Sequence, residues 1–175
     1  LDMGINLIDL AAVYGYGLSE EIIMKALDTP ARKEKAILAT KAGVIWNSDG
    51  QVWRDASAQS IRKEIDDSLK RLNREYIDIY QLHWPDPKVS IQESAETFKS
   101  LYNEGKIRAI GVSNFSVDQL MEWMKYAPLH SVQPPYNLFE RETEDEILPF
   151  AHQNNISVIS YGSLCRGLLT GKFNL

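Results

Sequence analysis

The sequence predicts an α/β fold in which parallel strands alternate with helices, of the (β/α)8 TIM-barrel type. The main observation is a repeat, because six apolar runs of β type each end at a polar or ionisable residue. Helix-like segments separate most of these runs, which is the order of parallel β-α units. Such units place the carboxyl end of every strand on one rim, so six separate positions are expected to converge on one site. The repeat therefore indicates an enzyme.

The predicted strands are short and continuously apolar, as expected for strands that are covered on both faces. They lie at 5–8, 36–40, 77–82, 107–112, 131–132 and 156–160, and lead into Asp9, Lys41, His83, Ser113, Gln133 and Tyr161. A closed barrel needs eight strands and typically about 250 residues. We therefore expect residues 1–175 to be a partial barrel domain, roughly from the second to the seventh strand, with the first and last barrel units absent.

The segments between the strands carry helix signals. Ser19 is predicted to cap the first helix ahead of two glutamates, and Ser57 to cap the second. The second helix has an apolar stripe at spacings of four, four and three residues, formed by Ile61, Ile65, Leu69 and Leu72. Ser90 and Glu93 are predicted to form a capping box, and Ser116 precedes the next helix. A last helix is expected around residues 147–154.

Composition narrows the classes of function. The chain has 44% hydrophobic and 25% charged residues, which is an ordinary globular balance. Its net charge of −5 argues against a nucleic-acid partner, and no apolar stretch of about 18 residues predicts a membrane span. The single cysteine, Cys165, suits a cytoplasmic protein. His130 and His152 lack partners at metal-ligand spacing, so we predict surface histidines and no metal site.

Four polar residues in the first half of the chain suggest a reaction site. Lys41 at the end of a buried strand needs a counter-ion, and Asp9 on the neighbouring strand is the natural partner. Tyr14 lies in the glycine-containing loop after Asp9, and a lysine cation beside a phenol is expected to lower its pKa. Such a tyrosine can protonate a carbonyl oxygen, and His83 on the next strand could hydrogen-bond the same oxygen.

The ordered motifs of the chain resemble those of the aldo-keto reductase family, most closely its bacterial and potassium-channel-β-subunit-like branch. The similar segments are Asp9-Leu10-Ala11-Ala12-Val13-Tyr14, Ala39-Thr40-Lys41, Gln81-Leu82-His83-Trp84, Gly111-Val112-Ser113-Asn114-Phe115, Gln133 with Tyr136-Asn137-Leu138, and Tyr161 with Gly167-Leu168-Leu169-Thr170-Gly171-Lys172. They cover essentially the whole chain in the order found in the family.

The resemblance implies a role for each matching position. Asp9, Tyr14, Lys41 and His83 would form the catalytic tetrad of a reductase that converts aldehydes or ketones to alcohols with NADPH, with NADH as a second possibility. Tyr14 would be the proton donor. The residues implied in cofactor binding are Ser113, Asn114 and Gln133 at the nicotinamide amide, Tyr161 on its ring, and Gly162, Ser163, Leu164, Arg166 and Gly167 at the pyrophosphate.

Trp46 and Trp84 follow catalytic strand ends, so they are candidates for the substrate pocket, with ordinary aromatic packing as the alternative. Gly162-Ser163 replaces the Ser-Pro that many family members have after the stacking tyrosine, and this leaves the pyrophosphate contacts open. The expected substrate is a small-molecule carbonyl compound.

Other functions remain open at this point. A nicotinamide-binding sensor or regulatory subunit of the same fold would keep the same residues and turn over very slowly. A barrel aldolase would use Lys41 as a Schiff base, and Tyr14 would then have no purpose. The chain could also be inert by itself.

Overall fold

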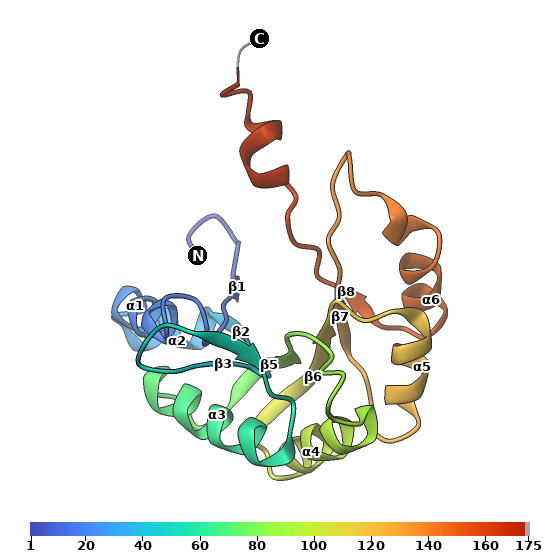
Figure 1. Ribbon diagram of the computed structural model, residues 1–175. Coiled ribbons are helices and arrows are strands. Elements are labelled where there is room, and N and C mark those ends of the chain that lie inside the picture. The colour runs from blue at the N-terminus through green and yellow to red at the C-terminus, as the bar shows by residue number, and fades with distance from the viewer. Residues whose placement is uncertain (174–175) are drawn as a thin grey trace.

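The computed structural model describes residues 1–173 and contains one main sheet of six parallel strands (Figure 1). The strands are β1 (Leu7–Asp9), β2 (Ile37–Ala42), β5 (Ile77–Leu82), β6 (Ile107–Ser113), β7 (Ser131–Gln133) and β8 (Ser157–Val158). Each pairs with the next in the order β1-β2-β5-β6-β7-β8, so spatial order follows chain order. This confirms the prediction of parallel β-α units and of one strand for each of the six runs.

The helices lie along the outside of the curved sheet (Figure 1). They are α1 (Leu18–Ala26), α2 (Pro30–Lys35), α3 (Ala58–Arg71), α4 (Ile91–Asn103), α5 (Val117–Met124) and α6 (Ile147–Gln153), with 3-10 turns η1 (Glu142–Glu144) and η2 (Cys165–Thr170). The sheet and its outer helices have the arrangement of part of a (β/α)8 barrel. None of the helices in residues 1–173 is long and apolar enough to cross a membrane.

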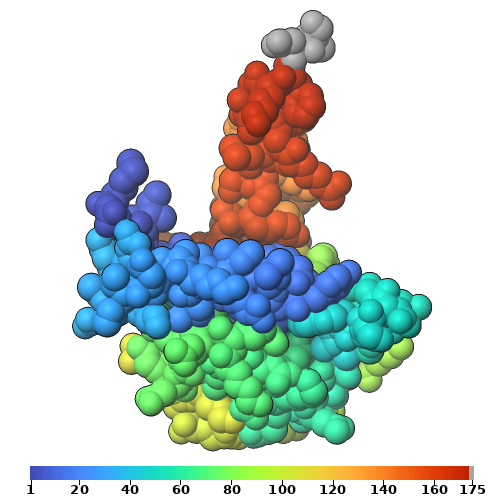
Figure 2. Space-filling view, turned by 90° about the vertical axis from the view of Figure 1, so that its left-hand side faces the viewer, coloured from blue at the N-terminus to red at the C-terminus, as the bar shows by residue number. Residues whose placement is uncertain are grey.

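A hairpin that the sequence analysis missed follows β2. Strands β3 (Val44–Trp46) and β4 (Val52–Arg54) pair antiparallel, and Asn47 closes the turn by accepting hydrogen bonds from the backbone of Asp49 and Gln51. The signal was present as two short apolar runs around Asn47-Ser48-Asp49-Gly50. Figure 2 shows this hairpin beside α3, and it shows the C-terminal segment standing away from the body of the protein.

The predicted helix caps are mostly confirmed. Ser57 and Ser116 accept the expected hydrogen bonds, and Ser116 with Gln119 forms a full capping box. Ser90 also caps its helix, but Glu93 binds the backbone of Ala58 and does not return to Ser90. The prediction for Ser19 is wrong. Its hydroxyl donates to the Ala11 carbonyl, and the helix begins two residues earlier, at Leu18 after the cap residue Gly17, whose φ of 95° only glycine adopts easily.

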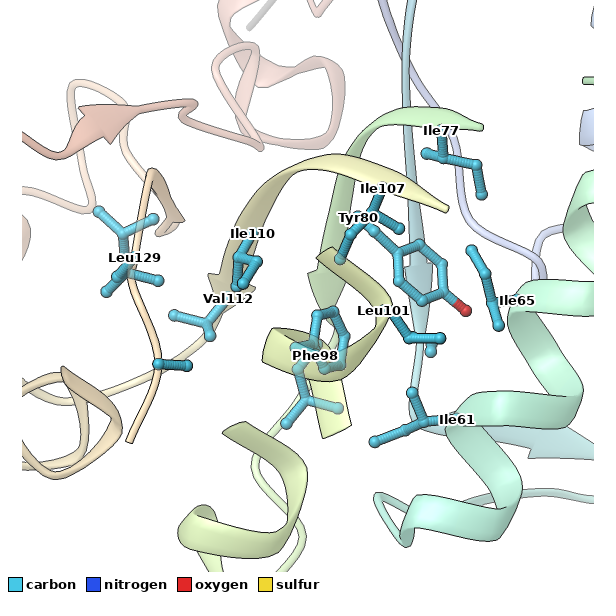
Figure 3. Packing of buried hydrophobic residues seen from close by; sticks show 14 of the residues in the cluster. Ile61, Ile65, Ile77, Tyr80, Phe98, Leu101, Ile107, Ile110, Val112 and Leu129 are labelled. Carbon is cyan, nitrogen blue, oxygen red and sulfur yellow. The ribbon is translucent and has the colours of Figure 1, made fainter. Parts of the chain in front are cut away.

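The core fills the space between the sheet and the helices (Figure 3). Phe98 of α4 is at its centre, stacked on Tyr80 of β5 at 5.3 Å and edge-on to Trp123 of α5 at 5.5 Å between ring centroids. All three side chains are fully buried. Burial of this aromatic cluster joins two successive β-α units of the sheet.

One smaller prediction is wrong, and Met124, next to the fully buried Trp123, is 39% exposed. His130 was expected at the surface, yet it is only partly exposed: its Nδ1 accepts a hydrogen bond from the backbone N–H of Ile110, and its ring packs on Tyr102. In both cases the neighbouring unit, which spacing alone does not specify, determines burial.

We predict that Phe98→Ala lowers the free energy of unfolding by about 3–5 kcal/mol, because it leaves a cavity between two aromatic rings. Lys99→Ala, at the next and exposed position of the same helix, should change it by less than about 0.5 kcal/mol. Urea unfolding of both variants measures the difference. A loss below about 1 kcal/mol for Phe98→Ala would contradict its central place in the core.

Candidate active site

The site is built around an ion pair between the first two strands of the sheet. Asp9 ends β1 and pairs in the register with Ala39 of β2, and Lys41 follows two residues later near the end of β2. The Lys41 Nζ donates to both Asp9 carboxylate oxygens at 2.9 Å and to the Leu10 carbonyl at 2.7 Å. All three ammonium hydrogens therefore have an acceptor. Because Lys41 is 2% exposed, this ion pair is the natural way to keep its charge in the core.

This arrangement bears on the aldolase alternative. Burial lowers the pKa of Lys41, while Asp9 opposes that shift through its charge and its hydrogen bond. A Schiff-base lysine needs a free amine lone pair to attack a carbonyl. The Nζ of Lys41 is instead held by three acceptors, which favours a fixed cation.

Tyr14 lies in the loop between β1 and α1, on the same side of the sheet as the ion pair. Its backbone N–H donates to the Ala11 carbonyl and its carbonyl accepts from Ser19, so the loop is compact. The Lys41 Nζ is 5.4 Å from the centre of the Tyr14 ring, and the ring of His83 stands edge-on to it at 5.9 Å. The fold thus brings the four predicted residues Asp9, Tyr14, Lys41 and His83 together.

The predicted direction of the Tyr14 pKa is wrong. Partial burial raises the pKa of the phenol, and the negative charge of Asp9 and then Tyr161 raise it further. The main physical reason is burial, which disfavours the phenolate, and Asp9 against Lys41 also opposes the lysine field that was expected to stabilise that anion. In this structure Tyr14 therefore holds its proton firmly.

His83 follows β5 directly and is held by its neighbours. Its backbone N–H donates to the Ala42 carbonyl, and its carbonyl accepts from the Asn114 Nδ2 at 3.0 Å. Burial lowers the pKa of the imidazole to about 4, and the charge of Lys41 adds to this effect while Asp9 opposes it. The ring is therefore neutral at neutral pH.

The candidate nicotinamide-binding residues lie next to this cluster and are joined by hydrogen bonds. The Ser113 hydroxyl donates to the Gln133 carbonyl at 2.8 Å, and the Tyr161 hydroxyl donates to the Asn114 Oδ1 at 2.7 Å. The Asn114 amide also donates to Ser113. Asn114 has a φ of 63°, a conformation that asparagine tolerates better than most residues.

Gln133 carries an unused donor. Its side chain is 2% exposed, and its Nε2 has no hydrogen-bond partner among residues 1–173. Buried amide nitrogens are normally paired, so an unpaired one beside a polar cluster is a candidate ligand contact. A carboxamide oxygen would satisfy it.

The candidate pyrophosphate residues form an exposed segment after β8. Gly162, Ser163, Leu164 and Arg166 are exposed and Gly167 is partly buried. The backbone turns sharply here, since Gly162 and Gly167 have φ of 71° and 95°, and the Gly162 carbonyl accepts from Asn137 at 3.2 Å. Within residues 1–173, this segment makes no hydrogen bond with Asp9, Tyr14, Lys41 or His83, so the structure does not bring the two groups into direct contact.

The two candidate substrate-pocket tryptophans have different neighbours. Trp46 of β3 packs on Tyr16 at 5.9 Å, and the Arg54 guanidinium of β4 lies 4.6 Å from the Trp84 ring. Arg54 also donates to the Pro85 carbonyl, which ties the hairpin to the segment after His83. The hairpin therefore forms a wall beside the site.

Gln81 is a site residue that the sequence analysis missed. It is fully buried in β5, and its Nε2 lies 3.5 Å from the Asp9 carboxylate. Side chains alternate along a strand, so Gln81 faces the same side as His83 two residues later. This spacing of two residues from His83 was the signal in the sequence that could have identified Gln81 as a site residue. Within residues 1–173 no cluster of His, Cys, Asp and Glu is arranged to hold a metal ion.

The fold and the site together define a class. Parallel β-α units place an aspartate, a lysine, a tyrosine and a histidine at one rim, where barrel enzymes carry their active sites. Comparison with known proteins gives the family: the sequence matches the aldo/keto reductase family over residues 1–175. The chain therefore belongs to the aldo/keto reductase family, and the resemblance drawn from its motifs is confirmed.

Individual relatives agree with this assignment. The chain is 56% identical over 172 residues to aldo-keto reductase YhdN of Bacillus subtilis, covering 98% of this chain and 52% of the relative. It is 40% identical over 180 residues to the NADH-specific methylglyoxal reductase of Escherichia coli, covering 96% and 55%. The solved glycerol dehydrogenase AKR11B4 of Gluconobacter oxydans superimposes with a TM-score of 0.94 at 53% identity, covering 99% and 54%. The chain thus spans about half the length of these relatives.

The electrostatics of the site predict how the His83 pKa responds to mutation. Lys41→Met removes a cation that disfavours the imidazolium, so the pKa of His83 should rise from about 4. Asp9→Asn removes the opposing anion, so the pKa should fall below about 4. NMR titration of the His83 ring in both variants measures the two shifts. Shifts of the same sign would contradict this account of the site.

Proposed function

We propose that the protein is an oxidoreductase that reduces aldehydes or ketones to alcohols with a nicotinamide cofactor, with Tyr14 as the general acid. The observation that carries the proposal is the contact between Tyr14, the Lys41–Asp9 pair and the neutral His83 ring. Membership of the family supports oxidoreductase chemistry. The single cysteine is in keeping with a cytoplasmic location, which stays part of the proposal.

Tyr14 suits proton donation to an oxygen that becomes negative during reduction. Its raised pKa keeps the phenol protonated until such an oxygen is present. As charge develops there, the fixed Lys41 cation nearby stabilises it, and a neutral His83 can donate one hydrogen bond without supplying a proton. The proton thus leaves the Tyr14 hydroxyl. Lys41 stabilises the charge that develops on the substrate oxygen, and the hydrogen bond from His83 orients that oxygen.

The residues next to Tyr14 fit a nicotinamide amide. The unpaired Gln133 Nε2 offers a buried donor, and Ser113 and Asn114 offer further polar atoms beside it. When bound, the cofactor supplies the hydride. We propose that Ser113, Asn114 and Gln133 hold the amide, that Tyr161 lies against the ring, and that the exposed segment 162–167 binds the pyrophosphate through backbone N–H groups.

The choice between NADPH and NADH is the finer part of the proposal. We propose NADPH on the strength of the sequence resemblance, although one relative is named as NADH-specific. For the substrate we propose a small oxygenated carbonyl compound, because relatives are named as a methylglyoxal reductase and a glycerol dehydrogenase. Trp46 and Trp84 would line its pocket, with Arg54 holding Trp84 in place.

We predict that Tyr14→Phe lowers kcat by roughly 10²- to 10⁴-fold, because it removes the proton donor and leaves the ring. The assay follows NADPH and NADH consumption with methylglyoxal and an aromatic aldehyde in the intact protein, and cofactor affinity by fluorescence. Affinity should stay nearly unchanged. The ratio of the two cofactor rates gives the preference.

Tyr16→Phe is the matched control, since Tyr16 lies in the same loop and its hydroxyl makes only a long exposed bond to the Gly50 carbonyl. It should keep the parent kcat. Retention of most activity by Tyr14→Phe would remove Tyr14 from the proton-donor role. Cofactor binding with very slow turnover in the parent would instead support a sensor or regulatory subunit.

We predict that Gln133→Leu weakens cofactor binding about 5- to 10-fold, the usual effect of losing one hydrogen bond of about 1 kcal/mol. Fluorescence titration measures the dissociation constant. Gln153→Leu, at an exposed position in α6, should leave it unchanged. Equal affinity in the parent and Gln133→Leu would count against a Gln133 contact with the cofactor.

A further inference from the structure

A buried carboxylate outside the site lies behind the strand that carries Lys41. Glu64 projects from α3, is 7% exposed, and accepts the backbone N–H of Gly43 on both oxygens at 3.0 and 3.1 Å. The Ser60 hydroxyl donates to the same carboxylate at 3.1 Å. None of the steps derived for the reaction uses this group.

The segment that Glu64 holds connects directly to two site residues. Gly43 is two residues after Lys41, and the carbonyl of Ala42 between them accepts the backbone N–H of His83 at 2.9 Å. Gly43 has a φ of 86°, and a Cβ there would lie 2.6 Å from Leu82, so the chain has no room for a side chain that could anchor it. A hydrogen bond to the backbone N–H is the anchor that remains.

A second carboxylate holds the strand on the other side of Lys41. Glu20 of α1 is fully buried, and it accepts the Thr40 hydroxyl at 2.7 Å and the Arg71 Nε at 2.6 Å. Because side chains alternate along a strand, Thr40 faces outward while Lys41 faces the site. Helices α1 and α3 therefore bind the chain on both sides of Lys41, at Thr40 and at Gly43.

We propose that Glu64 is a positioning residue for Lys41 and His83, acting through the Gly43 N–H to hold the end of β2. The proposal rests on the proposed reductase function for its kinetic consequences, but the contact itself does not. The carboxylate accepts this hydrogen bond more strongly as an anion than as a neutral acid. Protonation of Glu64 therefore loosens the strand end.

Two observations indicate that the Glu64 carboxyl gains and loses its proton near neutral pH. Burial raises the pKa of Glu64 to about 7, against the opposing effect of its hydrogen bonds from Gly43 and Ser60. Glu64 also lines a cavity of about 190 Å³. The charged and titratable groups around it are Asp55, Lys63, Asp67, Tyr80 of β5, and the Glu20–Arg71 pair.

The raised pKa has a cost in stability. The unfolded chain ionises this carboxyl at about pH 4.5, whereas the folded chain does so at about pH 7. The native state thus binds the extra proton between these values, and stability from this group falls as pH rises through that window. Packing gives no reason for an ionisable side chain at position 64, because its ionised form lowers stability there. The hydrogen bond from the Gly43 N–H to Glu64 does give a reason.

The first test is structural and needs no turnover. Lysine labelled with 13C at the ε carbon reports the surroundings of Lys41, whose signal is assigned by its loss in Lys41→Met. In the intact protein the Lys41 signal should show an inflection near pH 7. The inflection should vanish in Glu64→Gln, which cannot ionise, and persist in Asp67→Asn, one turn along the same helix and paired only with Lys63.

The second test is kinetic. Glu64→Leu removes the acceptor and should lower kcat at least about 10-fold with a smaller change in KM. Glu64→Gln keeps a neutral oxygen for Gly43, so its kcat should lie above that of Glu64→Leu, near the value of the parent at low pH, and should not show the fall in kcat that the parent shows below about pH 7. Asp67→Asn should retain that fall.

The outcomes separate this proposal from the proposed function. An inflection that is absent in the parent, or that survives in Glu64→Gln, overturns the positioning role whatever the activity. Loss of melting temperature in Glu64→Leu, with kcat and its pH profile unchanged for the folded fraction, overturns it as well. If the parent protein reduces no carbonyl compound, the proposed reaction is wrong. The pH response of the Lys41 signal still tests whether the Glu64–Gly43 contact positions Lys41.

Discussion

The ion pair between Lys41 and Asp9 is the interaction on which the site depends. A lysine at 2% exposure would lose its charge without a partner, and Asp9 with the Leu10 carbonyl provides three acceptors for its three hydrogens. The pair joins β1 to β2 at the rim and fixes a positive charge under the Tyr14 ring. Burial is the larger cause of the raised Tyr14 pKa and of the lowered His83 pKa, and the two charges of the pair add to it: Asp9 raises the pKa of Tyr14 further, and Lys41 lowers that of His83 further.

The rest of the structure holds that pair in place. On the outer side, buried carboxylates of α1 and α3 hold Thr40 and Gly43, which flank Lys41. Toward the neighbouring strands, His83 is tied to Ala42, and Asn114 is tied to both His83 and Tyr161. The aromatic core around Phe98 packs α4 against β5 and α5 on the outer side of the sheet. A hydrogen-bonded chain therefore runs across the carboxyl ends of the strands.

The hairpin connects the segments that follow two neighbouring strands of the sheet. The β3–β4 hairpin follows the strand that carries Lys41, and its Arg54 reaches Trp84 and Pro85 beyond His83. Barrels commonly vary in the loops after their strands while the strands stay similar. Arg54, Trp46 and Trp84 belong to these segments after the strands and make no hydrogen bond with the ion pair in the described residues.

The sequence by itself determined the six parallel strands, the family and the four central residues, because apolar runs and strand-end residues are local patterns that the parallel order places on one rim. Only the tertiary structure decided the direction of the Tyr14 pKa, since that depends on the burial of the phenol and on its nearness to Asp9. It also decided the burial of His130 and the contacts of Arg54, Gln81 and Glu64. These properties arise from contacts between distant segments, and spacing along the chain does not encode them.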